Sequence, residues 1–204
     1  WFKVRNVILF ILIIFNCNCR IESNYEEGLK NCLSNFARAK KLGSNASMSI
    51  GPDCLIGARV PDFEVELIDG SKYSNKNLKG KVSVINFWFI DCPPCVAEIN
   101  ALNSLVELFG KDKINYIAIG RDQKSDIELF LKNHVWNYNH ISGENNIIDT
   151  IFKLYWGYPT TFVLNKQTEI IYATSGGKSD STASKELLDK LIPIIKNAIE
   201  WDDL

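Results

Sequence analysis

The sequence predicts an α/β fold in which a central mixed β-sheet is flanked by helices and preceded by an N-terminal extension. A nearly continuous apolar run at 82–90 is typical of a central strand covered on both faces. Apolar residues then recur at steps of three and four over 96–109, which predicts a helix with one buried stripe. A second apolar strand follows at 114–119. This alternation, followed by a hairpin and a final helix, indicates a mixed sheet with helices on its faces.

Shorter patterns predict the other elements. Residues 25–42 are expected to form a helix, and a connector rich in Gly, Ser and Asn follows at 43–47. Polar and apolar residues alternate over 62–67, as they do in a half-buried strand. The remaining expected elements are helices at 126–133 and 147–154, strands at 161–164 and 169–173 with a turn between them, and an amphipathic helix at 184–199 with a kink at Pro193.

Length and composition are those of one ordinary domain with a short extension. The chain has 204 residues, of which 46% are hydrophobic and 23% charged. Its formal net charge of −1 leaves no basic excess to neutralise phosphates, so no nucleic-acid partner is expected. We expect a signal peptide or lipoprotein anchor at 1–19, the extension at 20–56 and the folded domain at 57–204.

The N-terminal segment has the features of an export signal. Lys3 and Arg5 precede a nine-residue apolar core at 7–15, which has the length of a signal-peptide core. Spanning a membrane takes about 20 residues. Cys17 follows where bacterial lipoproteins carry their lipidated cysteine, and Cys19 is a second candidate. The sequence therefore predicts a protein held on the periplasmic side of a bacterial membrane, with an uncleaved hydrophobic anchor as the alternative.

Cys32 and Cys54 flank the polar connector of the extension. In an exported protein, an isolated pair of this kind most often forms a structural disulfide, which would hold a weakly packed extension together. Two buried thiols or a second redox pair are the alternatives.

Cys92-Pro93-Pro94-Cys95 stands where the central strand gives way to a helix. Two cysteines at this spacing suit reversible dithiol–disulfide chemistry, because a helix N-terminus stabilises the reactive thiolate. A zinc site would need further Cys or His ligands, so no metal is expected. A purely structural disulfide would close a very small loop with little benefit. The pair is therefore predicted to be redox-active and to need no other cofactor.

Five short motifs occur in order between residues 57 and 177. They are VPDF at 60–63, LKGK at 78–81, NFW at 86–88, CPPC at 92–95 with Glu98, and GYPTTF at 157–162. In this set the chain resembles the TlpA/ResA-like thiol–disulfide oxidoreductases of the thioredoxin superfamily, which are related to the AhpC/TSA group.

The resemblance implies a thioredoxin-like fold with Pro159 in the cis form beside the disulfide. It also implies that the backbone of Tyr158 pairs with an incoming substrate peptide. Trp88 is expected to pack beneath the active-site turn and to complete the substrate-binding region.

The chemistry and the resemblance together suggest roles for three residues. Cys92 is expected to attack a client disulfide as the thiolate, and Cys95 to resolve the mixed disulfide. Glu98 lies three residues after Cys95, hence on the same helix face, and matches an acid that assists proton transfer in this family. From spacing alone, Glu98 would be an exposed helix residue.

Two departures from the family pattern bear on the direction of the reaction. Asp91 precedes Cys92, and a carboxylate beside a thiolate raises the thiol pKa. Pro94 has no backbone N–H, which removes one donor to the sulfur. Since both effects destabilise the thiolate, we expect a reductant.

The expected clients are disulfide-containing exported proteins, with a membrane thiol–disulfide electron donor as the second partner and a monomeric chain. One alternative is a peroxiredoxin-like thiol peroxidase, which would need a Thr three residues before Cys92, where Phe89 stands. Another is a client-binding module that catalyses nothing.

Overall fold

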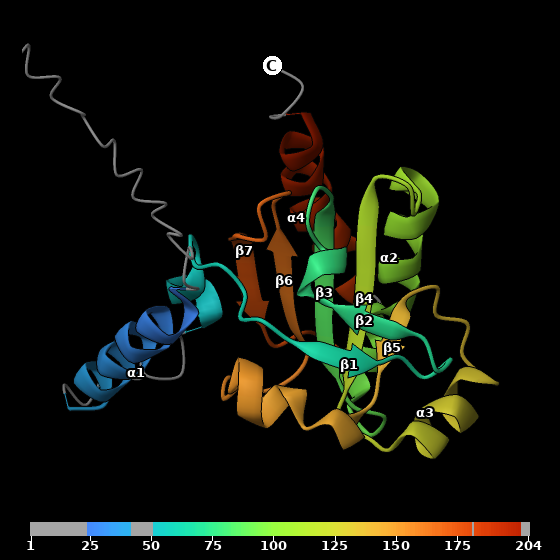
Figure 1. The fold of residues 1–204 in the computed structure, drawn as a ribbon, viewed down its shortest axis with the longest axis horizontal. Coiled ribbons are helices and arrows are strands. Elements are labelled where there is room, and N and C mark those ends of the chain that lie inside the picture. Colours follow the sequence, from blue (N-terminus) through green and yellow to red (C-terminus); the bar gives the residue numbers. More distant parts are fainter. Residues whose placement is uncertain (1–23, 42–50, 181, 201–204) are drawn as a thin grey trace, which may run out of the picture.

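A five-stranded mixed sheet forms the centre of the computed structural model, which describes residues 24–41, 51–180 and 182–200. The strand order is β5-β4-β3-β6-β7 (Figure 1). β4 is parallel to β3 and to β5, whereas β6 is antiparallel to β3 and to β7. The predicted mixed sheet is therefore confirmed. The strands are β3 (Val82–Trp88), β4 (Ile114–Gly120), β5 (Asn139–Ile141), β6 (Thr160–Leu164) and β7 (Ile170–Ser175).

The buried central strand β3 divides its side chains between two cores, because successive residues of a strand point to opposite faces. Val84 and Trp88 belong to the core shared with α2 (Pro93–Phe109) and α4 (Ala183–Glu200). Ile85 and Phe87 belong to the core on the other face. Figure 1 shows α2 and α4 behind the sheet and the hairpin of β1 (Glu64–Glu66) and β2 (Lys72–Ser74) in front of it.

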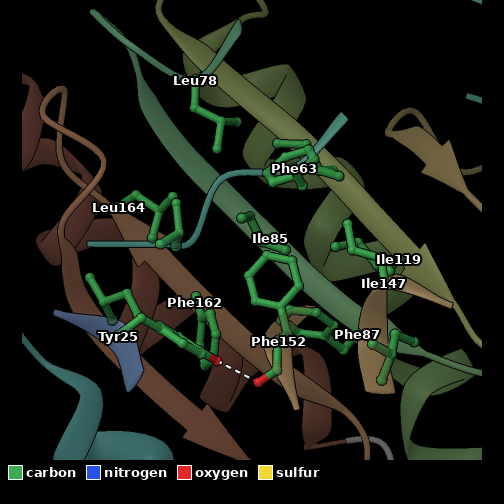
Figure 2. Close-up of a cluster of buried hydrophobic side chains, with 14 of the residues drawn as sticks. Tyr25, Phe63, Leu78, Ile85, Phe87, Ile119, Ile147, Phe152, Phe162 and Leu164 are labelled. Atoms are coloured by element: carbon green, nitrogen blue, oxygen red, sulfur yellow. Dashed lines mark hydrogen bonds between the residues drawn. The ribbon is translucent and has the colours of Figure 1, made fainter. Parts of the chain in front are cut away.

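Aromatic rings fill the core on the hairpin side of the sheet (Figure 2). Phe152 contacts Phe87 with ring centroids 4.9 Å apart, and its ring also contacts Tyr25 and Phe63, both at 6.1 Å. Phe152 ends η5 (Ile148–Phe152), a single π-helical turn where the sequence predicted an ordinary helix over 147–154. This segment thus closes one face of the sheet.

The N-terminal extension is attached to the domain by its first helix, α1 (Tyr25–Lys41), which lies on the β7 side of the sheet (Figure 1). The Tyr25 side chain is fully buried, and its hydroxyl donates a hydrogen bond of 2.9 Å to the Phe152 carbonyl. Cys32 of α1 and Cys54 of the short helix η2 (Pro52–Leu55) are joined by a disulfide.

Several sequence predictions fall on segments outside the described residues: the signal peptide, Cys17, Cys19 and the connector at 43–47. Of the helices that the structure describes, none has the length and apolar character needed to cross a membrane.

Three short elements complete the description. α3 (Lys124–Leu131) follows β4, and the 3-10 turns η3 (Asn75–Asn77) and η4 (Gly143–Asn145) lie in connecting segments. The predicted strand over 62–67 is shortened to β1, and α4 continues as a helix through Pro193. β2 and β5, each three residues long, were not predicted.

Candidate functional site

The Cys92–Cys95 pair lies where the chain leaves β3 and enters α2. Cys92 is the N-cap residue in an extended conformation, and Pro93 begins the helix. Proline is tolerated there because the first helical N–H groups have no intrahelical acceptor. The two sulfurs form a disulfide, and the Cys95 N–H donates to Cys92 Sγ over 3.3 Å. Both side chains are buried, 3% and 1% exposed, so the pair is covered rather than displayed on the surface.

The segment before Cys92 is held by the end of the neighbouring strand β4. The Ile90 N–H donates to Asp122 Oδ2 over 2.8 Å, and the Arg121 N–H donates to the Trp88 carbonyl over 3.0 Å. Arg121 and Asp122 were not predicted as site residues. The sequence does carry a signal for Asp122, because a carboxylate that closely follows the strand beside β3, and parallel to it, lies at the same end of the sheet as Cys92.

The Tyr158-Pro159 loop reaches the disulfide region because β6 runs antiparallel to β3, with Phe87 paired to Thr160. Residues just before β6 therefore lie beside residues just after β3. The Tyr158 and Phe89 rings are in edge contact, with centroids 5.3 Å apart. The Tyr158–Pro159 peptide bond is cis, as the resemblance implies. Pro159 is buried and Tyr158 is half-buried.

Trp88 does not reach the surface, since its side chain is fully buried. Its ring packs against Trp136 and Phe130, with centroids 4.7 Å and 5.2 Å apart. The expectation that it packs beneath the active-site turn agrees with this burial. The assignment of Trp88 as a substrate-binding residue is wrong for direct contact, because a side chain without exposed surface cannot touch a client.

Glu98 is a buried carboxyl group in the first turns of α2, with only 5% of its surface exposed. Burial raises the pKa of Glu98 to about 7, although Lys190 opposes this by lowering it. Among the described residues, Glu98 Oε2 has no hydrogen-bond partner. The alternative of an exposed helix residue is therefore excluded, and the carboxyl can change its protonation state near neutral pH.

Gly177 is a site residue that was not predicted from the sequence. A Cβ atom built on Gly177 would lie 2.6 Å from Glu98 Oε1 and 3.1 Å from Pro159 Cγ. The glycine backbone therefore lies against both the buried acid and the proline. Gly177 therefore brings the loop after β7 into contact with both Glu98 and Pro159.

Behind the site, a buried histidine packs among aromatic rings. The His140 and Trp136 rings are 5.2 Å apart, and His140 Nε2 donates to the Trp136 carbonyl over 3.3 Å. Burial lowers the pKa of His140 to about 4, so the ring is neutral at physiological pH.

A dithiol at the start of the helix that follows the central strand, together with an adjacent cis-proline loop, is the arrangement of a thiol–disulfide oxidoreductase with a thioredoxin-like fold. Comparison with known proteins gives the same class. The chain belongs to the AhpC/TSA family, which its residues 56–173 match.

Curated relatives that match this chain carry the name "Thiol-disulfide oxidoreductase ResA", and two of them illustrate the similarity. The protein from Bacillus thuringiensis is 29% identical over 143 residues, which are 68% of this chain and 79% of that protein. The protein from Bacillus cereus strain ZK / E33L is 31% identical over 121 residues, 57% of this chain and 67% of its own length. These matches support the class of thiol–disulfide oxidoreductase and the TlpA/ResA-like resemblance.

Solved structures share the fold. A Chlorobium tepidum structure described as a putative thiol:disulfide interchange protein DsbE has a TM-score of 0.60 at 17% identity, and the alignment covers 69% of this chain and 97% of that one. A second Chlorobium tepidum thioredoxin-family structure has a TM-score of 0.56 at 22% identity, with 69% and 95% covered. At these identities, the likeness establishes the thioredoxin-like fold alone.

Proposed function

We propose that this chain reduces disulfides of exported proteins through the Cys92–Cys95 dithiol, while tethered on the periplasmic side of a bacterial membrane. The observation that carries the proposal is the placement of both sulfurs at the N-terminus of α2, with the buried Glu98 carboxyl three residues after Cys95 on the same helix. The dithiol is its own redox group, and no further cofactor is needed.

The reaction divides into two exchanges. The Cys92 thiolate attacks one sulfur of the client disulfide, a mixed disulfide forms, and the other client sulfur leaves as a thiolate that takes a proton from water. Cys95 then gives its proton to the Glu98 carboxylate and attacks Cys92 Sγ. The Cys92–Cys95 bond forms, and the second client sulfur leaves and is protonated. The client gains two electrons and the protein loses two.

The sequence around Cys92 favours reduction as the direction. Residues 93 and 94 are both proline and have no N–H to donate, so a Cys92 thiolate lacks the two donors that other residues there would supply, and the first helical N–H that reaches Cys92 Sγ is that of Cys95. Asp91 is exposed directly before Cys92 and disfavours a negative sulfur. A poorly stabilised thiolate makes the disulfide form more stable relative to the dithiol, which is the property of a reductant.

The proposed location follows from the N-terminal sequence. The export signal with Cys17 favours a lipid or signal anchor, and a membrane thiol–disulfide donor would return electrons to Cys92–Cys95.

The Tyr158-Pro159 loop is the proposed docking edge for an extended segment of the client, and the chain is proposed to act as a monomer. Cys32–Cys54 is proposed as a structural disulfide.

The activity is tested by following insulin disulfide reduction and peroxide consumption with the same reduced protein. A reductase gives the first reaction only, a thiol peroxidase gives the second, and a binding module gives neither. Equilibration with glutathione tests the direction, and a reduction potential above that of the glutathione couple contradicts it.

The roles of the two cysteines are tested by trapping. Cys95→Ser should accumulate mixed disulfides on Cys92, because the resolving sulfur is gone. Cys92→Ser is the matched control, and it should capture no clients. Capture of the same clients by Cys92→Ser instead would reverse the assignment.

A further inference from the structure

A pocket of about 210 Å³ opens beside Glu98, between α2 and α4 and over the ends of β6 and β7. Glu98 supplies its acidic inner wall, Thr161 and Thr174 line the strand side, and Lys190 lies on α4. Only 5% of the Glu98 surface is exposed, and its Oε2 lacks a hydrogen-bond partner among the described residues. A buried, unpaired carboxyl oxygen beside a polar cavity is a position where water binds.

The pocket borders the Tyr158-Pro159 loop from the side of β7 and α4, because a Cβ on its lining residue Gly177 would lie 3.1 Å from Pro159 Cγ. Its lining comes from α2, β6, β7, α4 and the loop between the last two, whereas Cys92 and Tyr158 are not among its described lining residues. Glu98 must release its proton to water before the next cycle, and the pocket brings open space to the wall that Glu98 forms.

Several charged or titratable groups surround Glu98. Lys190 is an exposed cation on α4, and its charge favours the ionised form of Glu98. Lys178 is already paired with Glu186, so these two charges largely cancel at the pocket. The other titratable groups are Tyr172 of β7, which lines the pocket, and Tyr138, whose pKa Glu98 helps to raise. The two active-site sulfurs precede Glu98 on the same helix.

We propose that this pocket is the proton route between Glu98 and bulk water, and that Lys190 is a positioning residue that stabilises the Glu98 carboxylate across it. The inference rests on the proton-transfer role given to Glu98 in the proposed function. In the cycle, Glu98 accepts the proton of Cys95 and passes it to water in the pocket, so the carboxylate is restored with no change in electrons. Lys190 touches neither client nor sulfur and acts through Glu98 alone.

The test is a carbon-13 NMR titration of Glu98 in the full chain in the disulfide form, with the signal assigned by its loss in Glu98→Gln. Lys190→Met removes the cation and should raise the Glu98 pKa by about half a unit at low salt, whereas Lys190→Arg should restore the original value. Raising the ionic strength to about 0.5 M should shrink the difference, because exposed charges are screened. Lys196→Met, an exposed lysine on the same helix outside the pocket lining, is the matched control.

The route is tested by filling the pocket. Thr174→Phe should expel water and raise the Glu98 pKa further, while Thr174→Val keeps the pocket volume and should leave it nearly unchanged. Equal titrations in Lys190→Met and Lys196→Met, or in Thr174→Phe and Thr174→Val, would overturn the proposal. Failure of the proposed function gives a different result. The Glu98→Gln protein would then reduce insulin disulfides at the wild-type rate, while the Glu98 pKa would still shift in Lys190→Met and Thr174→Phe.

Discussion

Gly177 and Glu98 are in such close contact that any side chain at position 177 would have to displace the Glu98 carboxyl. A methyl group on Gly177 would stand 2.6 Å from Glu98 Oε1, well inside van der Waals distance, and would also press on Pro159. Gly177→Ala should therefore displace the buried carboxyl or the loop and lower the free energy of unfolding by about 1–3 kcal/mol. Urea denaturation of the disulfide form measures this cost.

Gly51→Ala is the control for that substitution, since its added methyl meets Asp53 Oδ1 at an ordinary 3.7 Å. Equal stabilities of the Gly177→Ala and Gly51→Ala proteins would contradict the prediction.

Glu98 should make the protein less stable as the pH rises. Its folded pKa of about 7 lies above the ordinary 4.5, so between these values the folded chain holds a proton that the unfolded chain has released. Stability is therefore lost from about pH 4.5 up to pH 7. The free energy of unfolding of Glu98→Gln should therefore exceed that of the wild type increasingly across this range, by up to about 3 kcal/mol. A difference between the two proteins that does not change with pH would refute the raised pKa.

His140 should have the opposite pH dependence. Because its folded pKa of about 4 is below the ordinary 6.5, the unfolded chain takes up a proton first on acidification. Stability is then lost as the pH falls from about 6.5 to 4. His140→Gln should remove up to about 3 kcal/mol of this loss, as measured by urea denaturation at several pH values. His134→Gln is the control, and an identical profile in both variants would argue against a buried neutral His140.

The Tyr25 hydroxyl should contribute to holding the extension on the domain. Tyr25→Phe keeps the ring but leaves the buried Phe152 carbonyl without this donor, at a cost of about 1–2 kcal/mol. Tyr155→Phe, at a residue that is 42% exposed, should change stability far less. Thermal unfolding of the two variants in parallel distinguishes them, and equal melting temperatures would count against the hydrogen bond.

The sequence predicted elements with strong periodicity and missed those without it. β3, β4 and α2 carry continuous apolar runs or a clear helical stripe, and each was placed within a few residues. β5 escaped because Asn139 and His140 are poor strand formers, and its pairing with β4 is decided by tertiary contact.

Within the site, the residues of local motifs could be predicted, and those brought in by distant contacts could not. Cys92, Cys95 and Pro159 stand in short recognisable segments of the sequence. Gly177 and Lys190 come near Glu98 only through the packing of β7 and α4 against α2. Trp88 was misassigned because a motif position does not reveal whether a side chain faces the surface or the core.

The ring of Phe152 has a consequence for how the chain unfolds. It touches Tyr25 from α1, Phe63 before β1, Phe87 from β3 and Phe162 from β6, and so joins segments that are far apart in the sequence. Detaching α1 exposes the same ring that the sheet needs for its packing. The extension and the domain therefore belong to one cooperative unit, and hydrogen exchange should find the Gly28 amide of α1, which is hydrogen-bonded to the Asn24 carbonyl, protected together with the amides of the central strands.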